Sequence, residues 1–138
     1  MAYWIVKSEP EEYSFEQLKA DKRTLWTGIR NFVARNNLRA MKSGDLALFF
    51  HTGKVKAVVG IAKVASPAQR DPTGPGDEDW VAVELAPVKA LSEPVPLSTL
   101  KANAKTKTIS SIKMGRLSVG AVTPAEWGAV LKLGKTAP

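Results

Sequence analysis

Three apolar segments in the middle of this 138-residue chain constrain its fold more than any other feature. Residues 46–51 and 55–65 are predicted as strands joined by a turn at 52–53. Residues 80–91 are predicted as a third long strand, in which Pro87 indicates an edge position or a bulge. This density of strands, with short helices before and after, predicts an α+β fold: a mixed sheet curled into a partly closed barrel and flanked by short helices.

Helix-start signals occur near both ends of the sequence. Ser14 is followed three residues later by Gln17, as in a capping box. Thr123 precedes Pro124, with Glu126 at the third helical position, which predicts a final helix. The remaining predicted elements are strands at 3–7, 25–26 and 116–119 and helices at 29–41 and 97–102.

The chain is predicted to form a single domain, residues 1–138, with a Pro/Gly-rich loop at 66–79. Its apolar runs are too short to cross a bilayer, and its N-terminus does not resemble a signal peptide. It has no cysteine, which excludes disulfides and Cys-based zinc sites. We therefore expect a cytoplasmic monomer without membrane contact.

The net charge of +7 is unevenly distributed. Six Lys or Arg residues and no acid lie within 22–42, and five with no acid lie within 101–116. Segregated basic segments favour a polyanionic partner, because phosphate contacts dominate the affinity of proteins for nucleic acid. An ordinary solvated surface is equally compatible with the charge alone.

The predicted helix at 29–41 is the most informative segment. At about 100° per residue, Ile29, Phe32 and Val33 share one face, and Asn36 falls on the same face. A buried amide needs several hydrogen-bond partners, so Asn36 is predicted to tie the helix to a neighbouring loop. The alternative is that Asn36 contacts the edge of a base.

Arg35 and Arg39 project together beside that face, and Arg30 projects from the far side. Because the helix contains no acid to pair with them, these arginines are predicted to contact phosphates, with a solvated helix face as the alternative. Trp26 lies in a non-helical link within the basic stretch. Its indole is predicted to be exposed and to stack on a base.

Little in the sequence supports an enzyme. His51 is the only histidine, so it cannot form a metal site or a dyad with a second one, and it is interpreted as a hydrogen-bonded strand-end residue. Glu9, Glu11 and Glu12 give no evidence of carboxylates opposed across a substrate. No phosphate-binding loop or dinucleotide motif is present. We expect no catalytic residue, no metal and no cofactor.

Four stretches resemble the EVE domain family. They are YWIVKSEP at 3–10, LWTGIRNFVARNNLRAMK at 25–42, GDLALFFH at 44–51 and RLSV at 116–119. Their order and spacing agree along essentially the whole chain. The resemblance implies a PUA-like fold, related to the YTH readers of methylated adenine, that binds a flipped-out modified base in a pocket.

By position, the resemblance implies a set of pocket residues: Ser8, Glu9, Trp26, Arg30, Asn31 and His51. Phosphate contacts are expected from Arg35, Arg39, Lys113 and Arg116. The chain departs from the commoner family pattern at Thr27, Phe32, Val33 and Gly120, where an Asp, a Tyr, a Gln and a Gln are usual. These departures leave the base preference open.

The sequence thus predicts a non-enzymatic module that recognises a modified base, such as C5-modified cytosine in DNA or a modified base in RNA. Two alternatives remain. One is an enzyme acting on modified nucleotides or RNA, which would need Glu9 or His51 as its titrating group. The other is a protein-interaction domain with a basic docking face.

Overall fold

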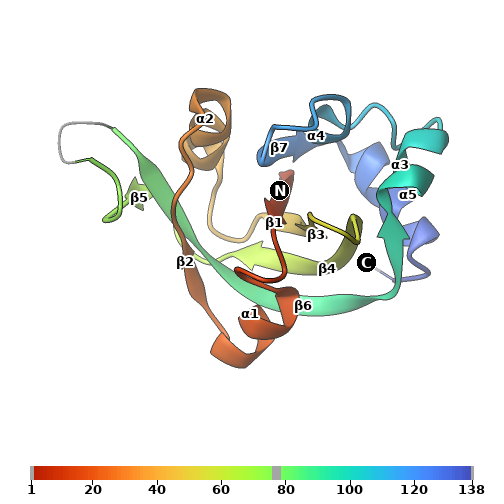
Figure 1. Cartoon of the computed structure of the whole chain (residues 1–138), viewed down its shortest axis with the longest axis horizontal. Helices are drawn as coiled ribbons and strands as arrows, with labels where there is room; N and C mark the ends of the chain where they lie inside the picture. The colour runs from red at the N-terminus through yellow and green to blue at the C-terminus, as the bar shows by residue number, and fades with distance from the viewer. Residues whose placement is uncertain (1, 76–78, 138) are drawn as a thin grey trace.

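The computed structural model describes residues 2–75 and 79–137 and contains a seven-stranded mixed sheet in the order β2-β6-β4-β3-β1-β7, with β5 paired to β6. The strands are β1 (Tyr3–Ser8), β2 (Thr24–Trp26), β3 (Leu46–His51), β4 (Ala57–Val64), β5 (Gln69–Arg70), β6 (Val81–Pro96) and β7 (Val119–Val122). The pairing of β1 with β3 is parallel and the other pairings are antiparallel. The sheet curls into a half-barrel (Figure 1), so the predicted α+β class and partly closed barrel are confirmed.

The helices are α1 (Phe15–Asp21), α2 (Phe32–Ala40), α3 (Leu97–Ala102), α4 (Ser110–Lys113) and α5 (Pro124–Leu133). Ser14 accepts a hydrogen bond from the Gln17 N–H, and Thr123 and Glu126 form the predicted capping box, so both helix-start signals are confirmed. Within the described ranges, no helix combines the length and the apolar character needed to span a membrane.

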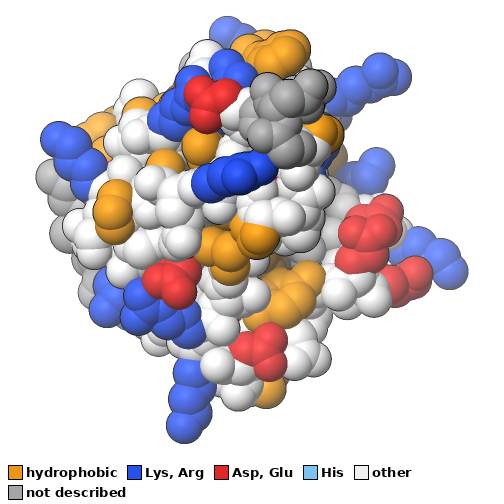
Figure 2. All heavy atoms as spheres, turned by 90° about the vertical axis from the view of Figure 1, so that its left-hand side faces the viewer, with side chains coloured by type: hydrophobic (Ala, Val, Ile, Leu, Met, Phe, Trp, Pro, Cys, Tyr) orange, Lys and Arg blue, Asp and Glu red, His pale blue; other side chains and the backbone are white. Residues whose placement is uncertain are grey.

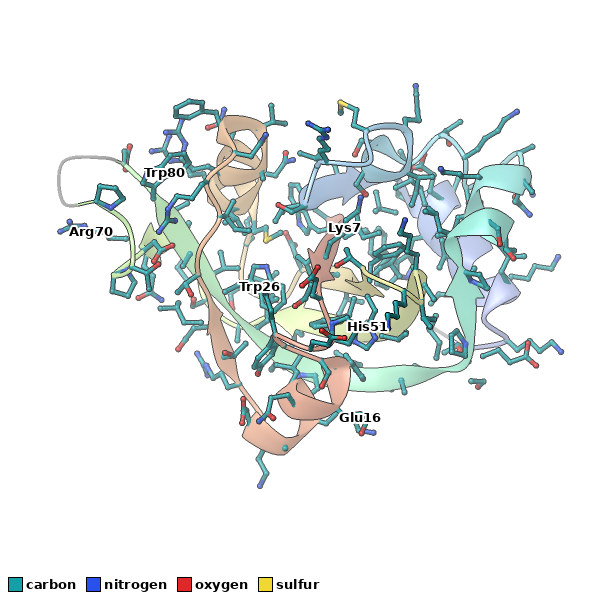
Figure 3. All side chains as sticks on the ribbon, in the orientation of Figure 1. Lys7, Glu16, Trp26, His51, Arg70 and Trp80 are labelled. Carbon is teal, nitrogen blue, oxygen red and sulfur yellow. The ribbon has the colours of Figure 1, made fainter. Side chains whose placement is uncertain are left out.

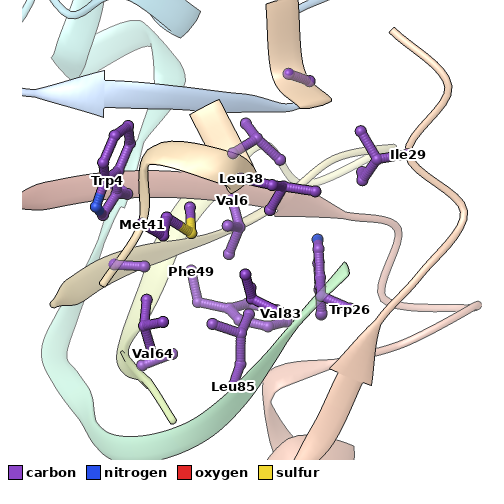
Figure 4. Packing of buried hydrophobic residues seen from close by; sticks show 14 of the residues in the cluster. Trp4, Val6, Trp26, Ile29, Leu38, Met41, Phe49, Val64, Val83 and Leu85 are labelled. Carbon is purple, nitrogen blue, oxygen red and sulfur yellow. The ribbon is translucent and has the colours of Figure 1, made fainter. Parts of the chain in front are cut away.

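The sheet is buried on both faces, which explains the continuous apolar runs of its central strands. Alternate side chains of β1 and β3 point to opposite faces. One face carries the α1–α2 cluster, in which Trp4, Val6 and Phe49 pack with residues of α1, α2 and β2 (Figure 4). The other carries the α3–α5 cluster, in which Ile5 and Leu48 pack with residues of α3, α4 and α5.

Strand β6 takes part in both clusters because it contains a bulge. Ala62 of β4 pairs with Pro87, whereas Ile61 pairs with Lys89, so one extra residue of β6 lies between them. An extra residue reverses the face to which odd-numbered side chains point. Leu85 therefore packs in the α1–α2 cluster and Leu91 in the α3–α5 cluster. The bulge indicated by Pro87 is confirmed.

The predicted loop at 66–79 and the predicted start of the last strand also need correction. The loop at 66–79 contains the short strand β5, and its residues 76–78 lie outside the described part. The last strand begins at Val119 and not at 116.

Helix α2 also differs from the prediction. It begins at Phe32 because Asn31 is its N-cap, with the side chain accepting a hydrogen bond from the Ala34 N–H. Its buried face is formed by Ala34 and Leu38, whereas Phe32 and Val33 are 64% and 54% exposed.

The predicted structural role of Asn36 is therefore wrong. Asn36 is exposed, and its side chain accepts hydrogen bonds from Arg35. The neighbouring amide carries out the predicted function instead: Asn37 Nδ2 donates to the Val119 carbonyl at 2.8 Å and ties α2 to β7. The buried face of α2 therefore lies about one residue further along the sequence than predicted, and Ile29 does not belong to the helix.

A methyl group at Gly60 would test the packing of α1 against β4. A Cβ at this position would lie about 2.5 Å from the buried ring of Phe15. We expect Gly60→Ala to lower the free energy of unfolding by about 1–3 kcal/mol, as overpacking does. Chemical denaturation measures this change. In the matched control Gly128→Ala, on α5 with open space at the Cβ position, stability should stay constant or rise. Equal effects of the two substitutions would contradict the packing argument.

Candidate nucleic-acid interface

A cavity of about 560 Å³ lies between the end of β1 and strand β2, and we call it the β1–β2 pocket. Its walls come from four parts of the chain, in sequence order: Lys7, Ser8, Glu9, Glu12 and Tyr13; Thr24, Leu25, Trp26, Thr27, Gly28 and Ile29; Thr52; Gly115, Arg116 and Ser118. Its volume is in the range of about 300–1,000 Å³ typical of small-molecule sites. Because β2 and β7 are the two edge strands, the pocket lies where the half-barrel stays open.

Trp26 forms an aromatic wall of this pocket but is not exposed as predicted. Its side chain is only 7% accessible and packs edge-on against Tyr13 and Phe49, with ring centroids 6.0 and 5.5 Å away. Figure 3 shows Trp26 and Lys7 in the central part of the molecule. Among residues 2–75 and 79–137, no group accepts a hydrogen bond from the Trp26 indole N–H. The residue therefore offers the pocket a ring surface and a free donor.

The polar side of the pocket is formed by the turn after β1. The Ser8 hydroxyl donates to the Tyr13 carbonyl at 2.7 Å, so its oxygen is left to act as an acceptor. Glu9 and Glu12 add two carboxylates, and Lys7 and Arg116 add two cations. Equal numbers of acidic and basic groups suit a neutral ligand with polar edges better than a highly charged one.

The wall at 27–29 is held in place by a buried carboxylate. Asp71 accepts hydrogen bonds from the Gly28 N–H at 2.8 Å, from Arg30 at 3.0 Å, and from the backbone and hydroxyl of Thr73 at 2.7 and 2.6 Å. Burial alone would raise the pKa of Asp71, but these hydrogen bonds outweigh it and lower the pKa to about 2. The loop after β5 is thereby tied to the segment between β2 and α2.

The predicted phosphate-binding arginines have partners that the sequence did not reveal. Arg30 pairs with Asp71, and Arg39 pairs with Asp79. Figure 2 shows the face that carries α2, β2 and β5, on which acidic and basic side chains are interspersed. Acids from distant segments therefore pair with Arg30 and Arg39, although residues 22–42 contain none.

Arg35 lies on an aromatic pair instead. Phe32 and Trp80 stack with centroids 5.2 Å apart, and the Arg35 guanidinium lies 4.9 Å from the Phe32 ring and 5.6 Å from the Trp80 ring. Arg30 approaches the Trp80 ring at 5.6 Å. This aromatic and cationic cluster near the start of α2 joins the exposed Phe32 to the buried Trp80, and it was not anticipated because Trp80 lies just before β6, far away in the sequence.

His51 does not line the β1–β2 pocket. Its Nε2 accepts a hydrogen bond from the Phe15 N–H at 3.1 Å, which positions the start of α1. Burial lowers the pKa of His51, partly opposed by the charge of Glu16. The interpretation as a strand-end residue with a structural partner fits this geometry. In the described part of the chain, no group of three or more His, Cys, Asp or Glu side chains is arranged to hold a metal ion.

The structure therefore brings together only some of the predicted site residues. Ser8, Glu9, Trp26 and Arg116 line one pocket. Arg30, Asn31 and His51 do not line this pocket. They hold neighbouring segments in place, through Asp71, the start of α2 and the start of α1 respectively. Lys113 lines a neighbouring cavity. Sequence reasoning missed Lys7, Tyr13 and Thr52, which no motif marks as polar wall residues. A larger hollow of about 1,160 Å³ between α5 and the segment after α3 contains none of the predicted residues.

The role of Asp71 predicts a specific dependence of stability on pH. A lowered pKa stabilises the fold above the pKa of the unfolded state, and this contribution is lost as the pH falls from about 4 to about 2. The contribution is about 2 kcal/mol in the free energy of unfolding. Asp71→Asn should remove it and flatten unfolding curves measured between these pH values. Asp79→Asn, which removes an exposed carboxylate, should change stability by less than about 1 kcal/mol. An acid dependence in Asp71→Asn as steep as that of wild type would contradict this assignment.

Solved structures share this fold over the full chain. Human THYN1 protein, in complex with 5-methylcytosine containing DNA, is 30% identical with a TM-score of 0.90, and the match covers 100% of both chains. The YTH domain of Zygosaccharomyces rouxii MRB1 protein, in complex with N6-methyladenosine RNA, is 15% identical with a TM-score of 0.59, over 99% of this chain and 88% of that one. The second likeness shows the fold alone.

Curated relatives correct the expected location. Thymocyte nuclear protein 1 of mouse is 32% identical over 99% of this chain and 75% of its own length, and its chicken and human counterparts carry the same name. These names point to a nuclear rather than a cytoplasmic protein, so the cytoplasmic prediction is contradicted. It rested on the absence of a signal peptide and of cysteines, which bears on secretion and does not separate nucleus from cytoplasm.

The profile of one family matches nearly the whole chain. The EVE domain profile covers residues 2–133, a range that includes every strand and helix of the fold and all walls of the β1–β2 pocket. Together with the identity to thymocyte nuclear protein 1, this match shows that the chain belongs to the EVE domain family.

Proposed function

We propose that this protein recognises a modified base, flipped out of a nucleic-acid strand, in the β1–β2 pocket, and that it is a reader and not an enzyme. The observation that carries the proposal is a single pocket with an indole wall on one side and unpartnered polar atoms on the other. The relationship to human THYN1, solved with 5-methylcytosine containing DNA, supports it.

The chemistry of the walls fits a base. Most of the affinity for a planar ring comes from its apolar faces, and Trp26 with Tyr13 offers aromatic surface for them. The Ser8 oxygen and the Glu9 carboxylate accept hydrogen bonds from an exocyclic amino group. Tyr13 and Trp26 are nearly perpendicular, with an interplanar angle of 80°, so a base that stacks on Tyr13 meets the edge of Trp26, whose N–H then donates to a ring nitrogen or carbonyl. A methyl group adds under about 1 kcal/mol of apolar burial, so the fit of the pocket must supply the discrimination.

The cations that can contact phosphates are those that no carboxylate of the protein already pairs with. Arg116 lines the pocket and is exposed, so we assign it to the phosphate of the bound nucleotide. Arg35 retains an exposed guanidinium edge above Phe32. Arg39 contributes only where a phosphate displaces Asp79.

Selectivity for the modified base depends on Trp26 in this proposal. Trp26→Phe keeps a ring in the wall but removes the N–H donor. We expect wild type to bind a 5-methylcytosine strand at least about tenfold, or about 1.4 kcal/mol, more tightly than its unmodified match. The ratio should fall severalfold in Trp26→Phe and stay unchanged in Trp127→Phe, a matched control that stacks on Tyr3 in the α3–α5 cluster. Fluorescence anisotropy at physiological salt measures the ratio, with DNA, RNA and N6-methyladenine strands in parallel. Equal affinity of wild type for every modified and unmodified pair would overturn the proposal.

The enzyme alternative has a separate test. Glu9 is the remaining candidate for a titrating group in the pocket, because the Nε2 of His51 is engaged by Phe15. We expect mass spectrometry to find modified oligonucleotides unchanged after prolonged incubation with the protein. Conversion that disappears in Glu9→Gln would establish catalysis instead.

A further inference from the structure

A second cavity, of about 330 Å³, adjoins the β1–β2 pocket, and we call it the lysine pocket. The two cavities share Lys7, Thr52 and Gly115 as a common wall. Four lysines line the second cavity, Lys7, Lys56, Lys101 and Lys113, and no acidic residue does. Lys101 also lines a shallow hollow that continues the basic surface past Lys54.

The positive charge of the lysine pocket is not neutralised within the described residues. Carboxylates at 2–75 and 79–137 form ion pairs with other cations, and none with Lys56, Lys101 or Lys113. Lys7 Nζ donates to the carbonyls of Ser111 and Gly115 at 2.7 and 3.1 Å, which leaves its charge uncompensated. Burial and the neighbouring charge of Lys101 lower the pKa of Lys7. Clustered cations without a counter-charge repel one another, and an anion in the cavity would relieve this repulsion.

The wall of the lysine pocket also contains an unsatisfied polar group. Among side chains in the described part of the chain, the Ser111 hydroxyl is the one buried polar group without a hydrogen-bond partner. Its residue provides the carbonyl that holds Lys7. An unpaired buried hydroxyl costs about 1–3 kcal/mol. Because this hydroxyl is buried, Ser111 contributes to the cavity through the carbonyl that accepts the hydrogen bond from Lys7.

We propose that the lysine pocket binds a phosphate of the same strand whose modified base occupies the β1–β2 pocket. This inference rests on the proposed function and extends it to the path of the strand. Lys7 lies in the wall between the two cavities, so a nucleotide in one places its neighbouring phosphate beside the other. Lys101 and Lys56 hold that phosphate, and Lys113 also lines the cavity.

The test uses charge-removing variants and strands of different extent. Lys101→Gln and Lys56→Gln remove one cation each without altering the β1–β2 pocket, and Lys63→Gln removes an exposed cation on β4 as the matched control. The probes are single strands with a 5-methylcytosine, either flanked on both sides or ending directly at its 5′ side or its 3′ side. Unmodified versions of each strand give the selectivity ratio.

We expect wild type to lose about fivefold in affinity when one of the two flanks is removed, the effect of one phosphate contact near physiological salt. Lys101→Gln should lose a similar factor in affinity on the full strand and nothing further on that truncated strand. Its salt slope should be smaller by about 0.7, the value for one phosphate contact on a single strand. Its ratio of modified to unmodified affinity should equal that of wild type. Non-additivity of variant and truncation identifies the contact.

Two results would overturn the inference. If Lys101→Gln and Lys56→Gln behave like Lys63→Gln, or if truncation and substitution add independently, the phosphate does not occupy the lysine pocket. Both results leave the selectivity of wild type intact, and thus the proposed function. Loss of selectivity in wild type itself would instead remove the proposed function and this inference with it.

Discussion

The carboxylate of Asp71 holds together two segments that have no regular secondary structure of their own. Residues 27–31 leave β2 and enter α2 through Gly28, which has a positive φ of 82°, and no sheet pairing fixes them. Four hydrogen bonds to Asp71 replace that pairing. The wall of the β1–β2 pocket, the orientation of Arg30 and the start of α2 all depend on this group. An ionised carboxylate can remain buried there because each oxygen accepts two hydrogen bonds.

Local signals predicted much of the fold correctly. Helices α1 and α5 begin where Ser14 and Thr123 accept hydrogen bonds, and α3 has the predicted bounds after Pro96. Each of these features depends on residues within one turn of each other. The burial of α2 was mispredicted because its inner face is set by β7, through a contact between Asn37 and Val119, 82 residues apart.

Charge was the least predictable property of the site, for the same reason. The basic stretch at 22–42 contains no acid, yet the fold brings Asp71 to Arg30, Asp79 to Arg39 and Glu84 to Arg23, over separations of 40 to 61 residues. Conversely, Lys7, Lys56 and Lys101 are scattered in the sequence and meet in one cavity. A run of like charges in the sequence predicts a charged surface only where the fold brings no opposite charges from distant segments beside it. Trp26 illustrates this limit for aromatic residues, since Tyr13 and Phe49 enclose an indole that its sequence neighbours would leave exposed.

The bulge in β6 has a consequence for how the molecule gains its structure. The two halves of this strand complete different cores, with Val83 and Leu85 in the α1–α2 cluster and Leu91 and Val95 in the α3–α5 cluster. Neither cluster can form if β6 pairs out of register. A slip of one residue would turn the apolar side chains of both halves of β6 away from their clusters. The two cores are therefore coupled through one continuous backbone, and we expect them to unfold together. Neither core is complete until β4 and β6 have paired in this register.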